Sequence, residues 1–240
     1  LQRLESAGID TRLIRIFPQE WTAQVFITMD CQGNQLATFM PGAMRRSGEI
    51  PVPAGAAALA HISPGDPLEM AQHAAECQAL GLPYVFDPGQ TTSQLAPEAL
   101  LRIAKGAFLV CLSHYEASLL EARCGVAPES LVSERRTILI THGAEGSEFL
   151  TASGPVQLPA APVRAVASAV GAGDAYRGGL LHGLTLGLSW ESCGKLGALM
   201  AAFKLESASP QGFRPSMREI EARYEQAWKE PLPRFRKSGS

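Results

Sequence analysis

The segment with the clearest chemical potential is a glycine-rich turn that leads into a predicted helix, Val170-Gly171-Ala172-Gly173-Asp174-Ala175-Tyr176. Small residues leave the backbone N–H groups at a helix N-terminus uncovered, so that these groups can bind an anion, and the helix dipole adds positive charge there. A carboxylate in the first turn, Asp174, is placed to accept a proton from a hydroxyl beside a bound phosphate. The same pattern also fits a plain helix start whose Asp stabilises the dipole.

Several other catalytic and nucleotide-binding motifs are excluded. A dinucleotide fingerprint needs Gly where Tyr176 stands, and Gly194-Lys195 is followed by Leu196 without the earlier Gly of a P-loop. The chain contains no H-E-x-x-H and no G-x-S-x-G motif, and its five histidines show no metal-ligand spacing. The glycine turn therefore remains as the leading candidate site.

Short apolar runs alternate with helix-length amphipathic segments along the chain. The runs 84–86, 107–112 and 137–140 are continuously hydrophobic, as in strands covered on both faces of a parallel sheet. Helices are expected at 67–80, 97–104, 114–123, 172–188, 190–207 and 216–228, and two further strands at 148–151 and 156–158. This alternation predicts an α/β fold with a doubly wound, mainly parallel sheet.

The N-terminal part follows a different pattern. Residues 21–30 and 35–40 flank the turn Cys31-Gln32-Gly33-Asn34 and predict a strand hairpin, which would form a small β lid. We expect three parts: a partial lid region at 1–45, an α/β nucleotide-binding core at 46–230 and a flexible tail at 231–240.

Composition restricts the partners and the compartment. The 240 residues carry 21 Lys and Arg against 23 Asp and Glu, which argues against nucleic acid or an anionic membrane surface as a partner. No run approaches the roughly 20 apolar residues that span a bilayer. The five cysteines are scattered without a C-x-x-C pair, which argues against a disulfide framework and a zinc site and favours a reducing cytoplasm.

Taken with its neighbours, the glycine turn resembles a known signature. Gly171-Ala172-Gly173-Asp174-Ala175-Tyr176 followed by Gly178-Gly179 is similar to the G-A-G-D-A-F-x-x-G motif of the ribokinase (PfkB) carbohydrate kinases. Other blocks stand in that family's order: Thr22-Ala23-Gln24, Pro41-Gly42-Ala43, Phe86-Asp87-Pro88-Gly89-Gln90, Tyr115-Glu116 and Thr141-His142-Gly143-Ala144-Glu145-Gly146. The residues of these blocks are most similar to those of the bacterial adenosine-kinase-like branch of the family.

The resemblance implies a kinase that uses ATP and Mg²⁺, with K⁺ as a further candidate, to phosphorylate a hydroxyl of an adenosine-like nucleoside or a sugar. It implies Asp174 as the base and the N–H groups of Gly171, Ala172 and Gly173 as an anion hole. Implied nucleotide-binding residues are Ser113, Glu116, Thr141, Gly143, Gly146 and Gln211, with Glu116 also at the metal, and implied substrate residues are Thr22, Gln24 and Phe26. The lid strands of such kinases often pair between subunits, so a homodimer through the lid is also implied.

Some residues depart from the family pattern. Ser113 replaces an Asn, Ser168-Ala169-Val170 replaces Asp-Thr-Thr or Asp-Pro-Thr next to the phosphate and monovalent-cation region, and Pro210 interrupts a glycine-rich turn. A family member would also have substrate-binding strands before Leu1, so we expect an N-terminally truncated chain. These departures leave open a catalytically impaired nucleotide- or nucleoside-binding relative, or a structural subunit. Plain structural roles also stay open for Glu116 as a solvated helix residue, for Gly143 and Gly146 as a turn, and for Phe26 as lid core.

Overall fold

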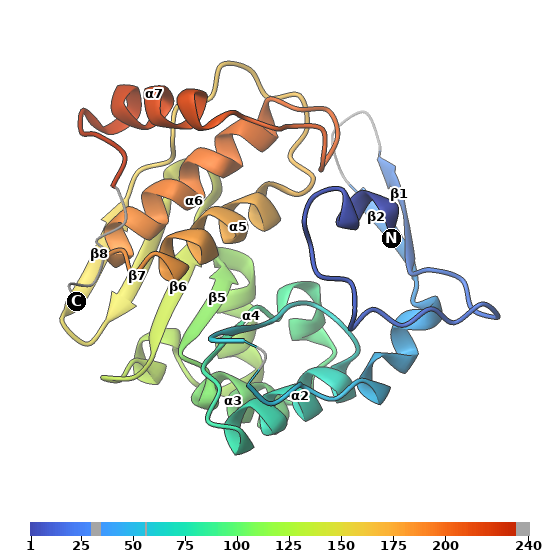
Figure 1. Cartoon of the computed structure of the whole chain (residues 1–240). Helices are drawn as coiled ribbons and strands as arrows, with labels where there is room; N and C mark the ends of the chain where they lie inside the picture. The colour runs from blue at the N-terminus through green and yellow to red at the C-terminus, as the bar shows by residue number, and fades with distance from the viewer. Residues whose placement is uncertain (30–34, 56, 234–240) are drawn as a thin grey trace. The chain divides into compact units, whose positions relative to one another are not determined.

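The computed structural model describes residues 1–29, 35–55 and 57–233 (Figure 1). The chain divides into two compact units, one formed by Leu1–Val110 and Ala122–Cys124 and the other by Cys111–Glu121 and Gly125–Ser240. The strand order of the main sheet is β3-β4-β5-β6-β7-β8, and β1 and β2 form a separate sheet. The predicted α/β fold with a small β sheet is confirmed. The division into 1–45, 46–230 and 231–240 stays a prediction.

The first unit contains the hairpin and the first strands of the main sheet. Its elements are α1 (Gln2–Glu5), β1 (Gln24–Met29), β2 (Gln35–Met40), the 3-10 helix η1 (Gly42–Glu49), β3 (Ala60–Ile62), α2 (Pro67–Ala79), β4 (Tyr84–Phe86), η2 (Gly89–Ser93), α3 (Pro97–Gly106) and the beginning of β5 (Leu109–Ser113). Strands β3, β4 and β5 run parallel, and every residue of β4 is buried. Sequence periodicity does not predict β3, because three residues are too few to show a pattern.

The predicted hairpin is present, with Gln24 opposite Met40 and Phe26 opposite Thr38. Strand β1 begins later than expected, because the Trp21 carbonyl accepts the N–H of Ala43 at 2.8 Å, outside the ladder between the two strands. The predicted turn Cys31-Gln32-Gly33-Asn34 lies outside the described residues.

The second unit contains the C-terminal strands and the long helices. Its elements are α4 (His114–Cys124, of which residues 122–124 belong to the first unit), η3 (Pro128–Leu131), β6 (Thr137–Thr141), η4 (Gly143–Glu145), β7 (Ser147–Thr151), β8 (Gly154–Leu158), α5 (Ala172–Thr185), α6 (Trp190–Leu205) and α7 (Met217–Trp228). Strands β6, β7 and β8 pair antiparallel. The helix boundaries agree with prediction to within three residues, because capping residues such as Ser113, Ser189 and Ser216 fix the helix starts.

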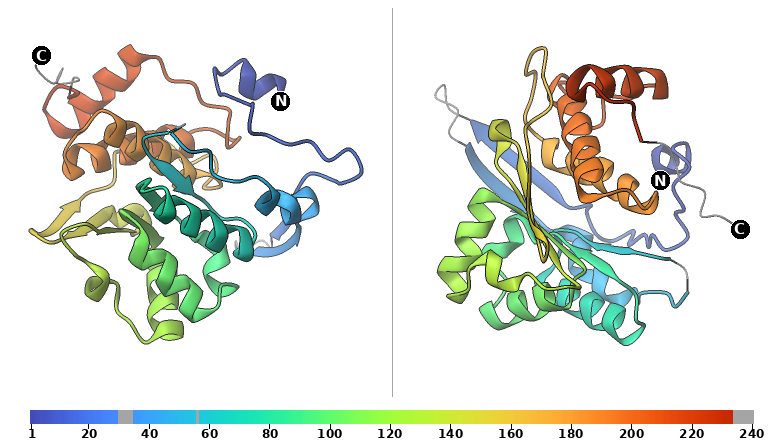
Figure 2. Two further views of the ribbon diagram at one scale, coloured as in Figure 1. Left: turned by 60° about the horizontal axis from the view of Figure 1, so that its bottom comes forward. Right: turned by 90° about the vertical axis from the view of Figure 1, so that its left-hand side faces the viewer.

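Helices α5 and α6 pack closely against each other, and α6 also contacts β8 and α7. All three helices lie on the same side of β7 and β8 (Figure 2, right). Gly179 permits the close approach of α5 to α6, because a Cβ atom there would lie 2.6 Å from the carbonyl oxygen of Leu196. Within the described ranges, no helix has both the length and the apolar content needed to cross a membrane.

Candidate active site

The N-terminus of α5 presents backbone donors. Gly171 is the N-cap and adopts a left-handed conformation with φ 85° and ψ 6°. The N–H of Ala172 donates to the carbonyl of Ala169 at 3.1 Å, and the N–H of Ala175 donates to that of Gly171 at 3.0 Å. In the described part of the chain, the N–H groups of Gly171, Gly173 and Asp174 have no acceptor. The positive end of the helix dipole therefore carries three available donors.

The carboxylate of Asp174 lies in the first turn of α5 and is open to solvent, with 86% of its side chain exposed. One guanidinium nitrogen of Arg177, one helical turn further along, lies 4.0 Å from a carboxylate oxygen of Asp174. A ligand that reaches the free N–H groups would therefore meet a carboxylate and a guanidinium on the same helix end. Arg177 was not predicted as a site residue, although its spacing of three from Asp174 places both on one helix face.

A cavity of about 640 Å³ opens beside this helix end. Its lining includes the predicted residues Thr141, Gly143, Gly146, Ala172 and Gly173. The volume is in the range of small-molecule and cofactor sites. The structure thus brings the end of β6, the turn at η4 and the start of α5 around one space.

Two further walls of the cavity were not predicted from the sequence. One is a face of α6 formed by Ala198, Ala201, Ala202 and Leu205, and their spacing of three and four residues is the signal that could have revealed it. The other is Tyr176, whose hydroxyl lies 2.8 Å from Oγ of Ser147. Burial raises the pKa of Tyr176 far above its usual range, so the phenol stays neutral.

Ser113 and Glu116 form the capping box of α4. The Ser113 N–H donates to a carboxylate oxygen of Glu116 at 2.7 Å, and the Glu116 N–H donates to Oγ of Ser113 at 3.3 Å. This start of α4 lies beside the end of β6, where the hydroxyl of Thr141 is 3.5 Å from the carbonyl oxygen of Leu112. Ser113 and Glu116 stand next to the cavity residue Thr141 and do not line the cavity themselves.

The residues present fit a Mg²⁺ ion that is bound mainly by phosphate and water. No cluster of three or more His, Cys, Asp or Glu side chains that could hold a metal ion occurs among the residues the structure describes. Mg²⁺ in phosphotransferases is bound by one or two carboxylates together with substrate phosphates and water. The family resemblance implies Glu116 as this carboxylate, and one of its oxygens accepts the Ser113 N–H in the cap of α4.

Gln211 lies in the turn after α6, on the surface, and does not line the cavity. Its N–H lies 3.4 Å from Oγ of Ser209. The neighbouring Pro210 packs against the start of α5, since a Cβ atom on Gly171 would lie 3.1 Å from Cβ of Pro210. The turn therefore touches the predicted anion hole through Pro210.

The predicted substrate residues Thr22, Gln24 and Phe26 belong to the first unit, whereas the cavity lies in the second. All three are exposed, and Phe26 exposes 56% of its surface. The interpretation of Phe26 as a core residue of the lid is therefore wrong for this chain, because the two-stranded sheet leaves its ring uncovered.

Residues 1–217 match the pfkB family of carbohydrate kinases. The nucleoside kinase of Methanocaldococcus jannaschii is 27% identical over 222 residues, which cover 92% of this chain and 73% of that protein. The structure of Burkholderia thailandensis nucleoside kinase in complex with inosine is 33% identical, with a TM-score of 0.91 over 96% of this chain and 76% of that one. The same enzyme in complex with ADP-inosine gives a TM-score of 0.89 at 33% identity, over 99% of this chain and 75% of that one. The chain therefore belongs to the pfkB family of carbohydrate kinases, phosphotransferases that act on a hydroxyl group, as the resemblance predicts.

Proposed function

We propose that the protein transfers the γ-phosphoryl group of ATP to a hydroxyl of a nucleoside. The observation that carries this proposal is the start of α5, where three free N–H groups and the exposed carboxylate of Asp174 adjoin a nucleotide-sized cavity. The similar proteins named nucleoside kinases, one of them in complex with inosine, support a nucleoside as the acceptor.

Each part of the site has a role in the proposed reaction. The apolar cavity between η4 and α6 accepts the base of ATP, while the N–H groups of Gly171, Gly173 and Asp174 receive the transferred phosphoryl group. The N–H of Ala172, which the resemblance implies as part of the anion hole, is not included here, because it already donates to the carbonyl of Ala169. Bound Mg²⁺ would neutralise charge on the phosphates, with Glu116 as its protein ligand.

Asp174 acts as the general base. As the substrate hydroxyl oxygen bonds to the γ-phosphorus, the bond from that phosphorus to the bridging oxygen breaks, ADP leaves, and the hydroxyl proton passes to the carboxylate of Asp174. The exposure of this carboxylate supports the role, because the acceptor hydroxyl must reach it.

The hairpin of the first unit is the proposed substrate-contacting element. The ring of Phe26 is exposed and suited to stacking on a base, with Thr22 and Gln24 as polar neighbours. The exposed apolar strands β1 and β2 also support pairing with the hairpin of a second copy. The four described cysteines form no disulfide, which supports a reducing compartment such as the cytoplasm.

The test is ADP release with ATP, Mg²⁺ and a panel of inosine, adenosine, cytidine and ribose. We expect turnover with at least one nucleoside and its loss in Asp174→Asn. The matched control is Glu98→Gln, an exposed acidic residue in the first turn of α3, which should leave turnover unchanged. Turnover with ribose alone would contradict the nucleoside assignment, and full turnover in Asp174→Asn would contradict the role of the base.

A further inference from the structure

Lys204, in the last turn of α6, is fully buried, with 0% of its surface exposed. Its ammonium group donates to the backbone carbonyls of Ser168 at 2.8 Å and Ser207 at 3.1 Å. Burial of an ammonium group is costly unless hydrogen bonds compensate it. Among the residues that the structure describes, no carboxylate pairs with this ammonium group, so its positive charge is held by carbonyl dipoles.

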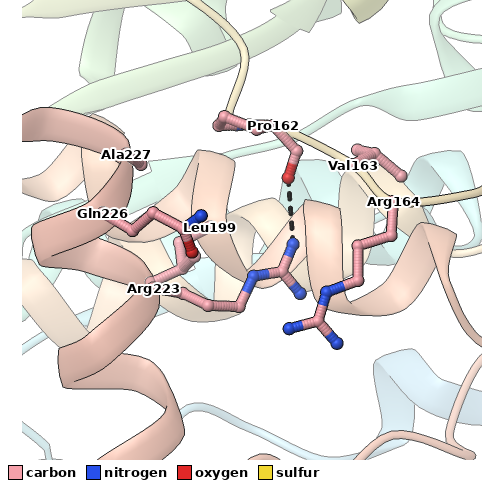
Figure 3. A pocket seen from close by; sticks show the side chains of 7 residues that line it. All are labelled: Pro162, Val163, Arg164, Leu199, Arg223, Gln226 and Ala227. Carbon is pink, nitrogen blue, oxygen red and sulfur yellow. Dashed lines mark hydrogen bonds between the residues drawn. The ribbon is translucent and has the colours of Figure 1, made fainter.

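The nearest acidic residue in sequence, Glu206, is already engaged. Its carboxylate accepts two hydrogen bonds from the guanidinium of Arg223, at 2.8 and 2.9 Å. Arg223 also donates to the carbonyl of Pro162 at 2.9 Å (Figure 3). These contacts join the C-terminal end of α6 to α7 and engage the carboxylate of Glu206 with Arg223 rather than with Lys204.

The two carbonyls belong to the two segments that meet behind the proposed anion hole. The segment before α5 is fixed further by Leu205, whose carbonyl accepts the N–H groups of Ala167 at 2.7 Å and Ser168 at 3.3 Å. A Cβ atom on Gly171 would lie 3.6 Å from Cε of Lys204. The ammonium-bearing side chain therefore packs directly against the residue that opens α5.

Backbone carbonyls are also the ligands that proteins use for K⁺. A lysine ammonium carries the same single charge and has three N–H donors. The family resemblance implies a monovalent cation next to Ser168-Ala169-Val170. In this chain, the segments that contain Ser168 and Ser207 meet at the ammonium group of Lys204. They do not fit a bound K⁺ in this chain, because Lys204 already occupies their carbonyls and Ser168-Ala169-Val170 supplies no carboxylate.

We propose that Lys204 is a built-in cation that replaces K⁺. It is a positioning residue: it holds the two segments together and adds positive potential behind the N–H groups that receive the phosphoryl group. This inference rests on the proposed function and predicts that nucleotide binding and phosphoryl transfer do not require an added monovalent cation.

The first arm of the test uses the unmodified protein. ADP affinity is measured by calorimetry, and nucleoside-dependent ADP release by a coupled assay, in KCl and in choline chloride at equal ionic strength. We expect both quantities to agree within about twofold between the two salts. A rise of about tenfold or more in K⁺ overturns the inference. Absence of turnover in both salts would instead refute the proposed function, while the ADP affinities still decide the role of Lys204.

The second arm uses variants whose folding is checked by circular dichroism. Lys204→Ala should weaken ADP binding by about tenfold or more, and K⁺ or methylammonium should restore part of the loss. Lys204→Met fills the space with its apolar stem and should show the loss without restoration. The control is Lys195→Met, which removes the other buried lysine of α6, paired with Glu191 and Glu230. It should lower stability without any cation response.

Two results of this arm refute the inference. One is a folded Lys204→Ala variant with wild-type ADP affinity, and the other is a loss of affinity that no monovalent cation restores. If Lys204→Ala does not fold, the comparison of KCl with choline chloride on the unmodified protein still shows whether binding and turnover require K⁺.

Discussion

Substitution of Gly171 by alanine tests whether the left-handed N-cap of α5 builds the phosphate site. With φ of 85°, a side chain at this position is strained, and its Cβ atom would lie 3.1 Å from Cβ of Pro210. The backbone conformation costs an L-residue about 1 to 2 kcal/mol. Displacement of a packed neighbour such as Pro210 adds about 1 kcal/mol or more. We therefore expect Gly171→Ala to lower the free energy of unfolding by about 2 to 3 kcal/mol.

The functional loss should exceed the loss of stability. Relief of the contact with Pro210 must move the start of α5 or the turn after α6, and both border the proposed anion hole. A displacement of this kind at a positioned reacting group lowers activity on the order of 100-fold. ADP release at saturating nucleoside reports kcat, and urea denaturation reports the free energy of unfolding.

Gly187 supplies the matched control. It lies just after α5 with φ of 67°, and a Cβ atom there would have no neighbour within 4 Å. Gly187→Ala should therefore lower the free energy of unfolding by about 1 to 2 kcal/mol through the backbone alone, with unchanged turnover. Equal losses of stability in the two variants, together with wild-type kcat in Gly171→Ala, would show that the N-cap at Gly171 does not build the phosphate site.

Two further substitutions test contacts around the cavity and α6. Tyr176→Phe should lower the free energy of unfolding by about 1 to 2 kcal/mol in urea denaturation, because the buried hydroxyl of Ser147 loses its hydrogen-bond partner. The double variant Tyr176→Phe with Ser147→Ala should recover part of the lost stability, because no buried hydroxyl is then left unpaired. Arg223→Met should lower the free energy of unfolding by about 2 kcal/mol or more, because the largely buried carboxylate of Glu206 loses its ion-pair partner. The control Arg218→Met, on the exposed surface of α7, should change the free energy of unfolding little. Burial acts to raise the pKa of Glu206, but the hydrogen bonds from Arg223 and the Arg164 N–H outweigh it and the pKa is lowered below the usual 4.5. The stabilisation from this ion pair is therefore present above pH 4.5 and is lost as the pH falls through the lowered pKa of Glu206. The difference in free energy of unfolding between wild type and Arg223→Met should shrink in acid, and a difference that does not change with pH would contradict the role of the ion pair.

The helices and the buried strands of the second unit were predictable from local signals. Ser113 and Ser216 begin helices through capping boxes, and the residues of β6 form a continuous apolar run. The N-terminus of α5 was also predictable, because glycines followed by Asp174 mark a helix start open to an anion.

The rest of the site depends on tertiary contacts that no local pattern reveals. The hydrogen bond from the Lys204 ammonium to the carbonyl of Ser168 joins residues separated by 36 positions along the chain. The contact of Pro210 with Gly171 is of the same kind. Glu116 shows the opposite case, in which a residue assigned to metal from family resemblance also has a local structural role as part of a helix cap.

Single-turnover transfer of radiolabelled γ-phosphate from ATP to inosine tests whether Asp174 is the base of a nucleoside kinase. The side chain is exposed, and loss of its charge at the helix N-terminus should lower the free energy of unfolding by only about 1 kcal/mol or less, so Asp174→Asn should keep the fold and the ADP affinity of the wild type. The rate of transfer should fall by about 100-fold or more. Transfer at the wild-type rate in Asp174→Asn, with inosine phosphate as the product, would contradict the assignment.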